Sequence, residues 1–492
     1  MKTVDDINRK IERGDVNVVT AIEMKEIISE LGTDKASEEV DVVTTGTFGA
    51  MCSSGAFLNF GHADPPIKMK RVWLNDVEAY TGIAAVDAYL GATQLSESIS
   101  NYGGAHVLED LIRGKEIQLK ADGYVTDCYP RKEIATEIGL EDLNQATMVN
   151  PRNSYQRYNA AANSSGRALH TYMSALLPNL GNVTYAGVGS LSPLNNDPEY
   201  RTIGIGTRIF LGGAKGYVMG EGTQHSPPFG TLMVKGDLKE MSTEWIRAAF
   251  FPGYGSTLFV GIGAAIPILD AEMAKATGIR DEEIVVNIID FGVQRRDKPV
   301  VRKANYAELK SGKIEINGEE VRVSPLSSYY NAKKIAEELV GMVKTGEFLL
   351  SAPVGKIPQK AVTKSLRHGV KEVKSVMCNA IIISGDTSIQ EASRLMVENN
   401  ATHLPVTGEG DVLLGIVTSW DIAKVVANGE NGDVSKIMTK KVVTSMPGET
   451  VDIVAKKMEQ YGISALPVID SKRVIGLITS EEVSKALMEA RK

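Results

Sequence analysis

The stretch that decides the fold of the C-terminal third is MCNAIIISGDTSIQEASRLMVENNATHLPV, residues 377–406, because it returns as MTKKVVTSMPGETVDIVAKKMEQYGISALPV over residues 438–468. The two copies stay in register to within one residue from the leading methionine to the Leu-Pro-Val triplet. Self-similarity of this length indicates a duplicated structural unit rather than a chance motif.

Each copy has the pattern of a short strand followed by an amphipathic helix. AIIIS and KVVTS are the expected first strands, since they are β-branched runs bounded by turn residues. Two further strands and a last helix complete each predicted unit. The apolar positions of the first helix recur at three- and four-residue steps, as expected for one buried face: Ile389, Ala392, Leu395 and Met396 in the first copy, and Val451, Val454, Ala455 and Met458 in the second.

The repeat resembles a tandem pair of CBS domains, a module that senses adenosine-containing molecules. We expect the first domain over residues 371–430 and the second over residues 431–492. The resemblance implies clefts between the copies that take S-adenosylmethionine or AMP/ATP, with a Thr-x-x-Asp step at the head of each last helix holding the ribose. The corresponding effector-binding residues are Thr418 and Asp421 in the first copy and Thr479 and Glu482 in the second, where Glu replaces the expected Asp. N-capping without a ligand is the alternative role of these side chains.

Composition and charge exclude several classes of function. The 492 residues carry 54 Lys plus Arg against 61 Asp plus Glu, for a net charge of −7, which argues against a nucleic-acid partner. No apolar run is long enough for a membrane span, and the N-terminus lacks a signal-like apolar region. We therefore expect a soluble, cytoplasmic protein. Its three cysteines are far apart and predict neither a disulfide framework nor a metal site.

The part of the chain that precedes the repeat is predicted to be one large α/β domain, residues 1–365, of undetermined sheet topology. Glycine-bounded apolar runs indicate buried strands, and helices are expected at residues 20–31 and 270–277. A charged run at 330–345, followed by SAPVGKIPQK, is interpreted as the separation from the sensor. The glycine-rich LGGAKGYVMGEG lacks the spacing of a nucleotide-binding loop and predicts tight turns instead.

GYVTDCYPRKE, residues 123–133, places a cysteine directly before a Pro-Arg-Lys run. Pro130 is a favourable first helical residue, so we predict that a helix begins there and that Cys128 lies just outside its N-terminus. The helix dipole, together with Arg131 and Lys132, would favour the reactive thiolate form. A small buried cysteine is the structural alternative.

Asp127 opposes that trend if its carboxylate faces the sulfur, and supports it if the side chain caps the predicted helix. A second cysteine, Cys52, lies in TTGTFGAMCSSGAFLNFGHADPP, where a buried strand runs into a Gly/Ser loop. Loops at strand ends commonly carry functional groups. The alternatives for Cys52 are a packed turn residue or a second thiol that faces Cys128.

TTGTFGAMCSSGAFLNFGHADPP, NDVEAYTGIAAVDAYLGATQ, ADGYVTDCYPR and GIGTRIFLGGAKGYVMGEGTQH together resemble, over about residues 5–365, the archaeal and bacterial homocysteine biosynthesis family. Members with a C-terminal CBS pair are typical of methanogens. The resemblance implies an L-aspartate semialdehyde sulfurtransferase, which incorporates sulfide into the aldehyde and forms L-homocysteine after two-electron reduction. It also implies that the two functional cysteines are Cys128, as persulfide carrier, and Cys52, as second thiol.

The resemblance implies further partners. Electrons are expected from a separate ferredoxin-like iron–sulfur protein with a NIL domain, and the chain itself has neither the cysteines of an iron–sulfur cluster nor a flavin fingerprint. No tightly bound cofactor is predicted, and CBS pairs commonly form homodimers. For the substrate carboxylate the candidates are Arg131 and Lys132, and for the acid that protonates the developing alkoxide they are His62 and His225.

Two other classes of function remain open at this point. An IMP dehydrogenase type enzyme also combines a cysteine with CBS repeats, although there the repeats are inserted within a barrel rather than appended. A non-catalytic metabolite sensor would use the large domain only to bind a ligand or partner. Replacing either N-terminal cysteine separates the sensor from the enzyme, because only the enzyme would lose a reaction.

Overall fold

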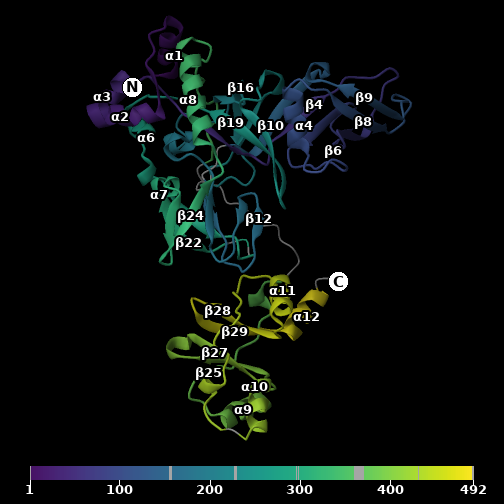
Figure 1. Ribbon diagram of the computed structural model, residues 1–492, viewed down its shortest axis with the longest axis vertical. Helices are drawn as coiled ribbons and strands as arrows, with labels where there is room; N and C mark the ends of the chain where they lie inside the picture. Colours follow the sequence, from purple (N-terminus) through teal and green to yellow (C-terminus); the bar gives the residue numbers. More distant parts are fainter. Residues whose placement is uncertain are drawn as a thin grey trace. The chain divides into compact units, whose positions relative to one another are not determined.

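The computed structural model describes residues 2–154, 158–226, 230–294, 296, 298–358, 371–429 and 431–489. The chain divides into two compact units, residues 1–363 and 364–492, each with its own buried core (Figure 1). Both units mix helices and strands, as the sequence predicts. No helix within these described residues has the length and apolar character that crossing a membrane requires.

The first unit is built on a large antiparallel sheet, which has nine strands in the described part of the chain. All its neighbouring strands pair antiparallel. The strands, in order across the sheet, are β18 (Ile246–Phe251), β19 (Gly255–Gly263), β15 (Arg208–Leu211), β16 (Ala214–Glu221), β17 (Leu232–Asp237), β10 (Gln145–Ser154), β4 (Gly55–Asn59) and β7 (Asp87–Gly91), with β3 (Thr47–Ala50) also pairing β19.

Strand β19 is buried along almost its whole length because helices contact it: α4 (Gly104–Ile112) and α8 (Tyr329–Lys344). Gly261 and Gly263 permit the close approach of α8, since a Cβ on Gly263 would lie 2.6 Å from a Leu339 methyl carbon. The run at 330–345 is therefore a core helix of this unit, and its interpretation as a separating segment was wrong. Charge hid its apolar face, on which Ile335 and Leu339 are fully buried.

A second, mixed sheet forms the other part of the unit. Its six strands in the described residues are β22 (Val300–Asn305), β21 (Val285–Asp290), β11 (Ala160–Ala162), β14 (Asn182–Tyr185), β24 (Glu319–Pro325) and β23 (Lys313–Ile316). Beside it lies the hairpin of β12 (Leu169–Thr171) and β13 (Ser174–Leu176), and a three-stranded sheet joins β1 (Val18–Thr20), β2 (Val42–Thr44) and β20 (Ala265–Pro267). The remaining helices of the unit are α1 (Val4–Arg13), α2 (Ala21–Leu31), α3 (Thr33–Glu39), α5 (Pro193–Asn196), α6 (Ala271–Thr277) and α7 (Tyr306–Lys310).

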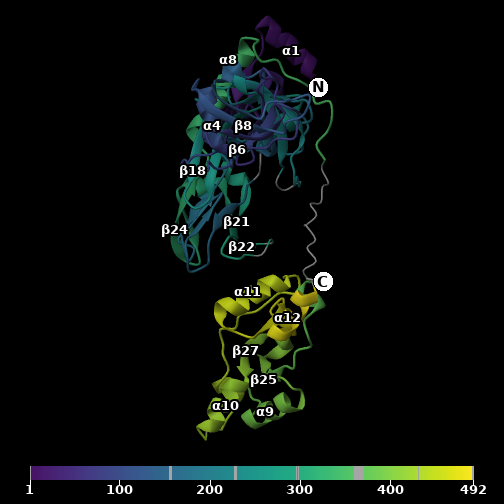
Figure 2. The same ribbon diagram turned by 90° about the vertical axis from the view of Figure 1, so that its right-hand side faces the viewer.

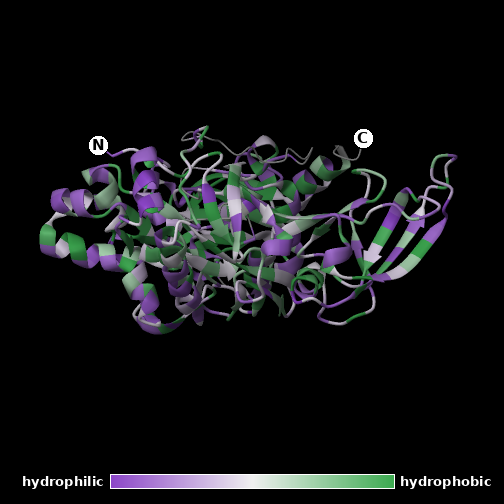
Figure 3. Ribbon diagram, turned by 90° about the horizontal axis from the view of Figure 1, so that it is seen from above, coloured by the Kyte–Doolittle hydropathy of each residue, from purple (hydrophilic) through white to green (hydrophobic). Residues whose placement is uncertain are grey.

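The predicted helix after Cys128 does not form. Residues 133–138 are instead strand β9 (Glu133–Ile138), the edge of a four-stranded sheet with β8 (Ile117–Gly123), β5 (Met69–Leu74) and β6 (Val77–Ala79). β8 alternates buried and exposed residues, and hydrophobic and hydrophilic bands alternate along the strands at the right of Figure 3. Pairing of β9 with this amphipathic strand overrides the helix signal of Pro130, so Cys128 has no helix dipole beside it.

The second unit contains the two repeats, and they fold as the sequence predicts in most respects. The first copy has β25 (Ile383–Ser384), α9 (Ile389–Glu398), β26 (His403–Thr407), β27 (Leu413–Thr418) and α10 (Ser419–Ala427). The second has α11 (Val451–Tyr461), β28 (Ala465–Asp470), β29 (Arg473–Thr479) and α12 (Ser480–Glu489). Figure 2 shows α9 and α10 at one end of this unit and α11 and α12 at the other.

One predicted strand of the second copy, KVVTS, is absent from the described residues. Only Ser445 forms an isolated bridge, with Val468. Side chains take over the bonding there, because Lys457 Nζ donates to the Thr444 carbonyl at 2.9 Å and the Ser445 hydroxyl donates to Glu449 at 2.6 Å.

The two copies exchange backbone hydrogen bonds. Cys378 pairs with Leu477 of the other copy through two bonds of 2.9 Å, and Thr439 pairs in the same way with Ile416. The equivalence of Cys378 and Thr439 gives the cysteine a structural role.

Candidate active site

Cys52 lies in a tight turn between β3, which pairs with β19, and β4, which pairs with β10 and β7. The Ser54 amide donates to the Met51 carbonyl at 3.0 Å and closes the turn. Gly55 follows because the backbone passes close to Tyr89, whose hydroxyl would lie 2.4 Å from a Cβ at that position. The turn is thus fixed on both sides by the large sheet.

The Cys52 sulfur is half-buried and faces hydroxyl groups. The Thr257 hydroxyl donates to it across 3.3 Å, and the Tyr254 hydroxyl also forms a hydrogen bond with it. Burial raises the pKa of Tyr254 well above its ordinary value, and charge on the neighbouring Cys52 sulfur raises it further. Tyr254 therefore stays protonated at neutral pH and can donate to a negative sulfur or oxygen.

Cys52 lines a cavity of about 420 Å³, within the size range of small-molecule sites. The cavity lies at the junction of the two large sheets of the first unit. Most of its residues come from the end of β3 and the turn after it, the end of β10, the β18–β19 turn and the β12–β13 turn, and the others follow β7, β14 and β24 or precede β11. The full lining is Ala50, Cys52, Ser53, Thr93, Arg152, Tyr158, Tyr172, Met173, Ala186, Tyr254 and Leu326. Two of its aromatic rings, Tyr172 and Tyr254, have centroids 6.4 Å apart.

Asn150 connects the Cys52 turn with the end of β10, where Arg152 contributes a positive charge to the cavity lining. This fully buried amide accepts from the Ser53 hydroxyl at 3.1 Å and donates to the Ser54 hydroxyl at 3.0 Å. Its oxygen also accepts from the Arg152 backbone amide at 3.1 Å. One side chain thereby fixes the turn of the thiol and the strand end that carries the arginine.

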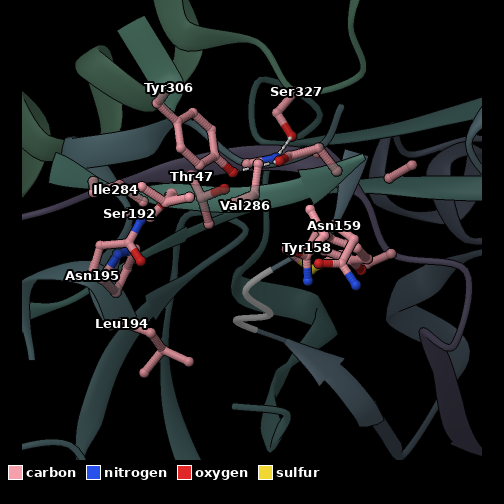
Figure 4. Close-up of a pocket in the computed structure, with 18 residues that line it drawn as sticks. Thr47, Tyr158, Asn159, Ser192, Leu194, Asn195, Ile284, Val286, Tyr306 and Ser327 are labelled. Carbon is pink, nitrogen blue, oxygen red and sulfur yellow. Dashed lines mark hydrogen bonds between the residues drawn. The ribbon is translucent and has the colours of Figure 1, made fainter. Parts of the chain in front are cut away.

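A smaller cavity of about 220 Å³ adjoins the first and shares Ala50, Tyr158 and Ala186 with it. Figure 4 shows Tyr306 and Ser327 on one side of it and Tyr158 and Asn159 on another. The Tyr306 hydroxyl donates to the Ala186 carbonyl at 2.8 Å, so this hydroxyl holds two parts of the cavity wall together.

The Cys128 turn is different from the Cys52 turn. Cys128 is exposed, and no hydrogen bond to its sulfur is found among the described residues. His62 stacks on the neighbouring Tyr129 with ring centroids 5.9 Å apart. Arg131 donates through Nε to the Pro65 carbonyl at 2.8 Å and through Nη2 to that of Asp64. The structure therefore gathers His62, Arg131 and Cys128, with Lys132 exposed next to them.

The structure does not bring Cys52 and Cys128 together. Cys52 precedes β4, whereas His62, which stacks on the Cys128 turn, follows it. A five-residue strand such as β4 extends over about 17 Å at roughly 3.3 Å per residue, so the thiols lie at opposite ends of this strand.

His225 lies in neither cysteine site, and both of its ring nitrogens already contact the backbone. It is 4% exposed, and its ring nitrogens lie 2.9 Å from the Thr231 carbonyl and 3.0 Å from the Pro358 carbonyl. Both contacts are to structural backbone, which makes the ring a tie between segments of the domain.

The sequence alone did not single out Tyr254, Tyr172, Arg152 or Asn150. They are 98 residues or more from Cys52 along the chain and converge only through strand pairing. A signal is present at Tyr254, which lies between two glycines in a turn that joins apolar strands. No such pattern marks Arg152.

The second unit has a cleft of about 460 Å³ between its copies. Its lining combines residues of the first copy with residues of the second: Thr402, His403, Ile416, Thr418, Ser419, Trp420, Thr439, Lys441, Val442, Val443, Gly462, Ile463, Ser464 and Ala465. Thr418 caps α10, and the Asp421 carboxylate accepts from the Thr418 amide at 3.0 Å and from its hydroxyl at 2.7 Å. Burial lowers the pKa of His403, opposed by the charge of Asp421.

The corresponding step of the second copy is built alike. Glu482 accepts from the Thr479 amide at 3.0 Å and from the Thr479 hydroxyl. Burial raises the pKa of the Cys378 thiol, and the charge of Glu482 adds to this. Both steps are thus capping boxes in this structure, with the ring of Trp420 beside the first one.

Comparison with known proteins gives the family of both units. The family described as "Homocysteine biosynthesis enzyme, sulfur-incorporation" matches residues 16–350, and CBS domains match residues 370–428 and 434–489. An L-aspartate semialdehyde sulfurtransferase of Methanosarcina acetivorans is 56% identical over 493 residues, which is 99% of each chain. One of Methanocaldococcus jannaschii is 52% identical over 503 residues, covering 99% of this chain and 98% of the relative.

Among solved structures, a CBS domain pair in complex with 5′-methylthioadenosine and S-adenosyl-L-methionine is 40% identical and covers 25% of this chain and 99% of its own, with a TM-score of 0.24. The family matches, together with relatives that extend over nearly the whole chain, establish that the chain belongs to the homocysteine biosynthesis family of sulfur-incorporating enzymes, here joined to a pair of CBS domains.

Proposed function

We propose that the chain is an L-aspartate semialdehyde sulfurtransferase that incorporates sulfide into the aldehyde and yields L-homocysteine. The observation that carries the proposal is the free Cys52 thiol in a cavity of substrate size, with two hydroxyl donors on its sulfur. Membership of the family and the names of the two full-length relatives support the choice of substrate.

The chemistry assigned to Cys52 is attack of a persulfide on the aldehyde carbon. The terminal sulfur forms the new carbon–sulfur bond, and the aldehyde oxygen takes up two protons and leaves as water. Reduction of the carbon and cleavage of the S–S bond then release the thiol product and restore the Cys52 thiol. Counted from sulfide, the conversion takes up two electrons and two protons, while the sulfane sulfur of a preformed persulfide requires two electrons more.

Tyr254 is the group we assign to the developing alkoxide. Its raised pKa keeps its hydroxyl protonated, and its contact with the Cys52 sulfur places it beside the carbon that the sulfur would attack. A buried, preorganised donor stabilises charge that develops in the transition state.

Cys128 is proposed as the surface persulfide carrier. Its exposed turn suits exchange with an external sulfur donor, and transfer to Cys52 is a thiolate attack that leaves the Cys128 thiol behind. Because the two thiols lie at opposite ends of β4, this transfer requires movement of the Cys128 turn or a Cys128 from a second copy of the chain.

The electrons are proposed to come from a NIL-domain ferredoxin-like iron–sulfur protein. We place the reaction in the cytoplasm, since a reducing compartment keeps free thiols such as these three reduced.

The test combines mass spectrometry with product formation. Protein treated with a sulfane sulfur donor is digested to locate any persulfide, and aspartate semialdehyde with a chemical reductant is then added. A mass increase of roughly 32 Da on Cys52 that disappears as homocysteine forms is expected. Absence of both the adduct and homocysteine would favour a metabolite sensor.

The CBS pair is proposed to bind an adenosine-containing effector, S-adenosylmethionine or AMP/ATP. The cleft of about 460 Å³, with the Thr418 hydroxyl and the Trp420 ring in its wall, supports this. Exposed apolar side chains on its helices, with Val426 64% and Met488 70% exposed, support homodimer formation. Titration calorimetry with each ligand tests the first proposal, and light scattering tests the second.

A further inference from the structure

Arg152 is the cation that faces the Cys52 cavity. Among the residues of the cavity lining given above, the guanidinium of Arg152 is the one positively charged group. Its Nη2 donates to the Gln224 side chain, and within the described part of the chain it has no ion-pair partner. A positive charge at a cavity mouth, held by a neutral amide rather than by a carboxylate, keeps its charge available to a ligand.

Arg152 and Cys52 both affect the pKa of the Tyr172 hydroxyl. Burial raises the pKa of Tyr172, the Arg152 guanidinium opposes that rise, and the Cys52 sulfur adds to it. One small molecule can therefore place its aldehyde carbon at the Cys52 sulfur and a negatively charged group at the Arg152 guanidinium. Part of the cavity wall, from Ala50, Met173, Ala186 and Leu326, is apolar and suits a short aliphatic chain, while Ser53, Thr93 and Tyr158 add polar groups.

We infer that Arg152 is the carboxylate-binding residue of the cavity and selects small aldehydes that carry a carboxylate. This rests on the proposed function for the identity of the aldehyde. Arginine presents paired N–H donors that match the two oxygens of a carboxylate. The buried Asn150 amide fixes the Arg152 backbone relative to the Cys52 turn and thereby sets the spacing between the two ends of the substrate.

The sequence-based candidates for this role are less suited to it. Arg131 donates to the Asp64 and Pro65 carbonyls, so its N–H groups already serve the fold. Both it and Lys132 lie beside Cys128, at the other end of β4 from the cavity.

The first test needs no turnover. Full-length protein is treated with iodoacetate, which is an anion, and with iodoacetamide, which is neutral and of similar size, and alkylation of Cys52 is followed by peptide mass spectrometry. Arg152→Gln should lower the iodoacetate-to-iodoacetamide rate ratio about five-fold, the factor that a nearby unit charge gives in a solvated site. Arg71→Gln, a substitution of an exposed arginine paired with Glu78, is the control and should leave the ratio unchanged.

The second test measures kcat/KM for aspartate semialdehyde and for propanal, which lacks the carboxylate. Arg152→Gln should lower the value about 10- to 100-fold for the first aldehyde, since this is the range of a hydrogen bond to a charged group, and change it less than about two-fold for propanal. Arg152→Lys should recover part of the loss, because it keeps the charge without the paired donors.

Three results would overturn the inference. Equal slowing of both alkylating agents would mean that Arg152 acts on the thiolate itself. A shift of the ratio in Arg131→Gln but not in Arg152→Gln would place the anion site elsewhere. Equal loss of kcat/KM for both aldehydes would assign Arg152 a structural role. If wild-type protein forms no homocysteine, the proposed function fails, while the alkylation ratio still decides whether the cavity prefers anions.

Discussion

Cys52 and Cys128 both lie in turns of the same domain, yet their surroundings differ. Cys52 is half-buried, with hydroxyl donors on its sulfur and a cavity before it, whereas Cys128 is exposed beside a stacked His–Tyr pair. Reactivity in enzymes depends on preorganised partners more than on sequence context. The comparison therefore supports our proposal that Cys52 carries out the carbon–sulfur chemistry and that Cys128 delivers the sulfur.

Replacing each thiol in turn should give the largest difference between the two cysteine sites. Cys52→Ser should lower homocysteine formation by about 10³-fold or more, because loss of a nucleophile typically costs this much. Cys128→Ser should lose activity with a protein sulfane donor but keep most of it with excess polysulfide, a small sulfane donor that can form the Cys52 persulfide directly. Product formation under both conditions is the measurement.

Cys378→Ser, in the CBS pair, is the control for these variants and should retain activity in both assays. Full loss in Cys128→Ser with polysulfide would contradict the division of roles, because a surface carrier would then be needed for the chemistry itself.

Removing the buried link behind Cys52 should have the next largest effect. Asn150→Ala leaves the Ser54 hydroxyl and the Arg152 amide without their partner, which should cost about 1–3 kcal/mol of the free energy of unfolding. Urea unfolding measures this, and activity should fall in soluble, folded variant protein. Asn144→Ala, an exposed amide that donates to Asn59, should change the free energy by no more than about 0.5 kcal/mol. Equal effects of the two substitutions would remove Asn150 from the site.

Loss of one donor to the sulfur should have a smaller, pH-dependent effect. Tyr254→Phe should slow iodoacetamide alkylation of Cys52 about three- to ten-fold at pH 7, since a hydrogen bond to a charged group stabilises the thiolate. Because the pKa of Tyr254 is raised, its proton remains in place as the pH rises to about 10, the ordinary tyrosine value, so the wild-type advantage should shrink at high pH only because both proteins become fully thiolate.

Tyr129→Phe, next to Cys128, is the matched variant and should leave Cys128 alkylation unchanged. Equal alkylation rates of Cys52 in wild-type protein and in Tyr254→Phe at pH 7 would argue that Tyr254 does not donate to the sulfur.

The sequence predicted the CBS pair well because each element there is local. The helix positions Ile389, Ala392 and Met396 all lie in the core, and duplication doubles the signal. The large domain was harder because its antiparallel strands pair over long separations, as β3 does with β19. The helix expected at Pro130 shows the limit of local reasoning, since the pairing of β9 with β8 decided the structure there.

The site was predictable to the same extent. The sequence singled out both cysteines as candidates from their loops, but Asn150 and Arg152 converge on Cys52 only through the pairing of β10 with β4. Residues placed together by a sheet leave no periodic trace in the sequence. For this reason the sequence pointed to cations near Cys128 in the chain and missed the one in the Cys52 cavity.

The smallest expected effect concerns the Cys128 turn. Arg131 ties this turn to the carbonyls of Asp64 and Pro65, but the contacts are near the surface and contribute little to global stability. Arg131→Ala should therefore change the free energy of unfolding by less than about 0.5 kcal/mol. It should nevertheless speed hydrogen exchange of the Tyr129 amide, which donates to the Thr126 carbonyl within the turn, by about five-fold.

A looser turn also has a consequence for sulfur transfer. If Cys128 must move to reach the cavity, Arg131→Ala should maintain or raise the rate with a sulfane donor, because less of the native turn has to be broken before the thiols meet. If the second thiol instead comes from another copy of the chain, the order of the turn would help docking, and the same substitution would lower that rate. Comparing the rate with a protein sulfane donor to that with polysulfide shows whether the change lies in transfer from Cys128, since only the former requires Cys128.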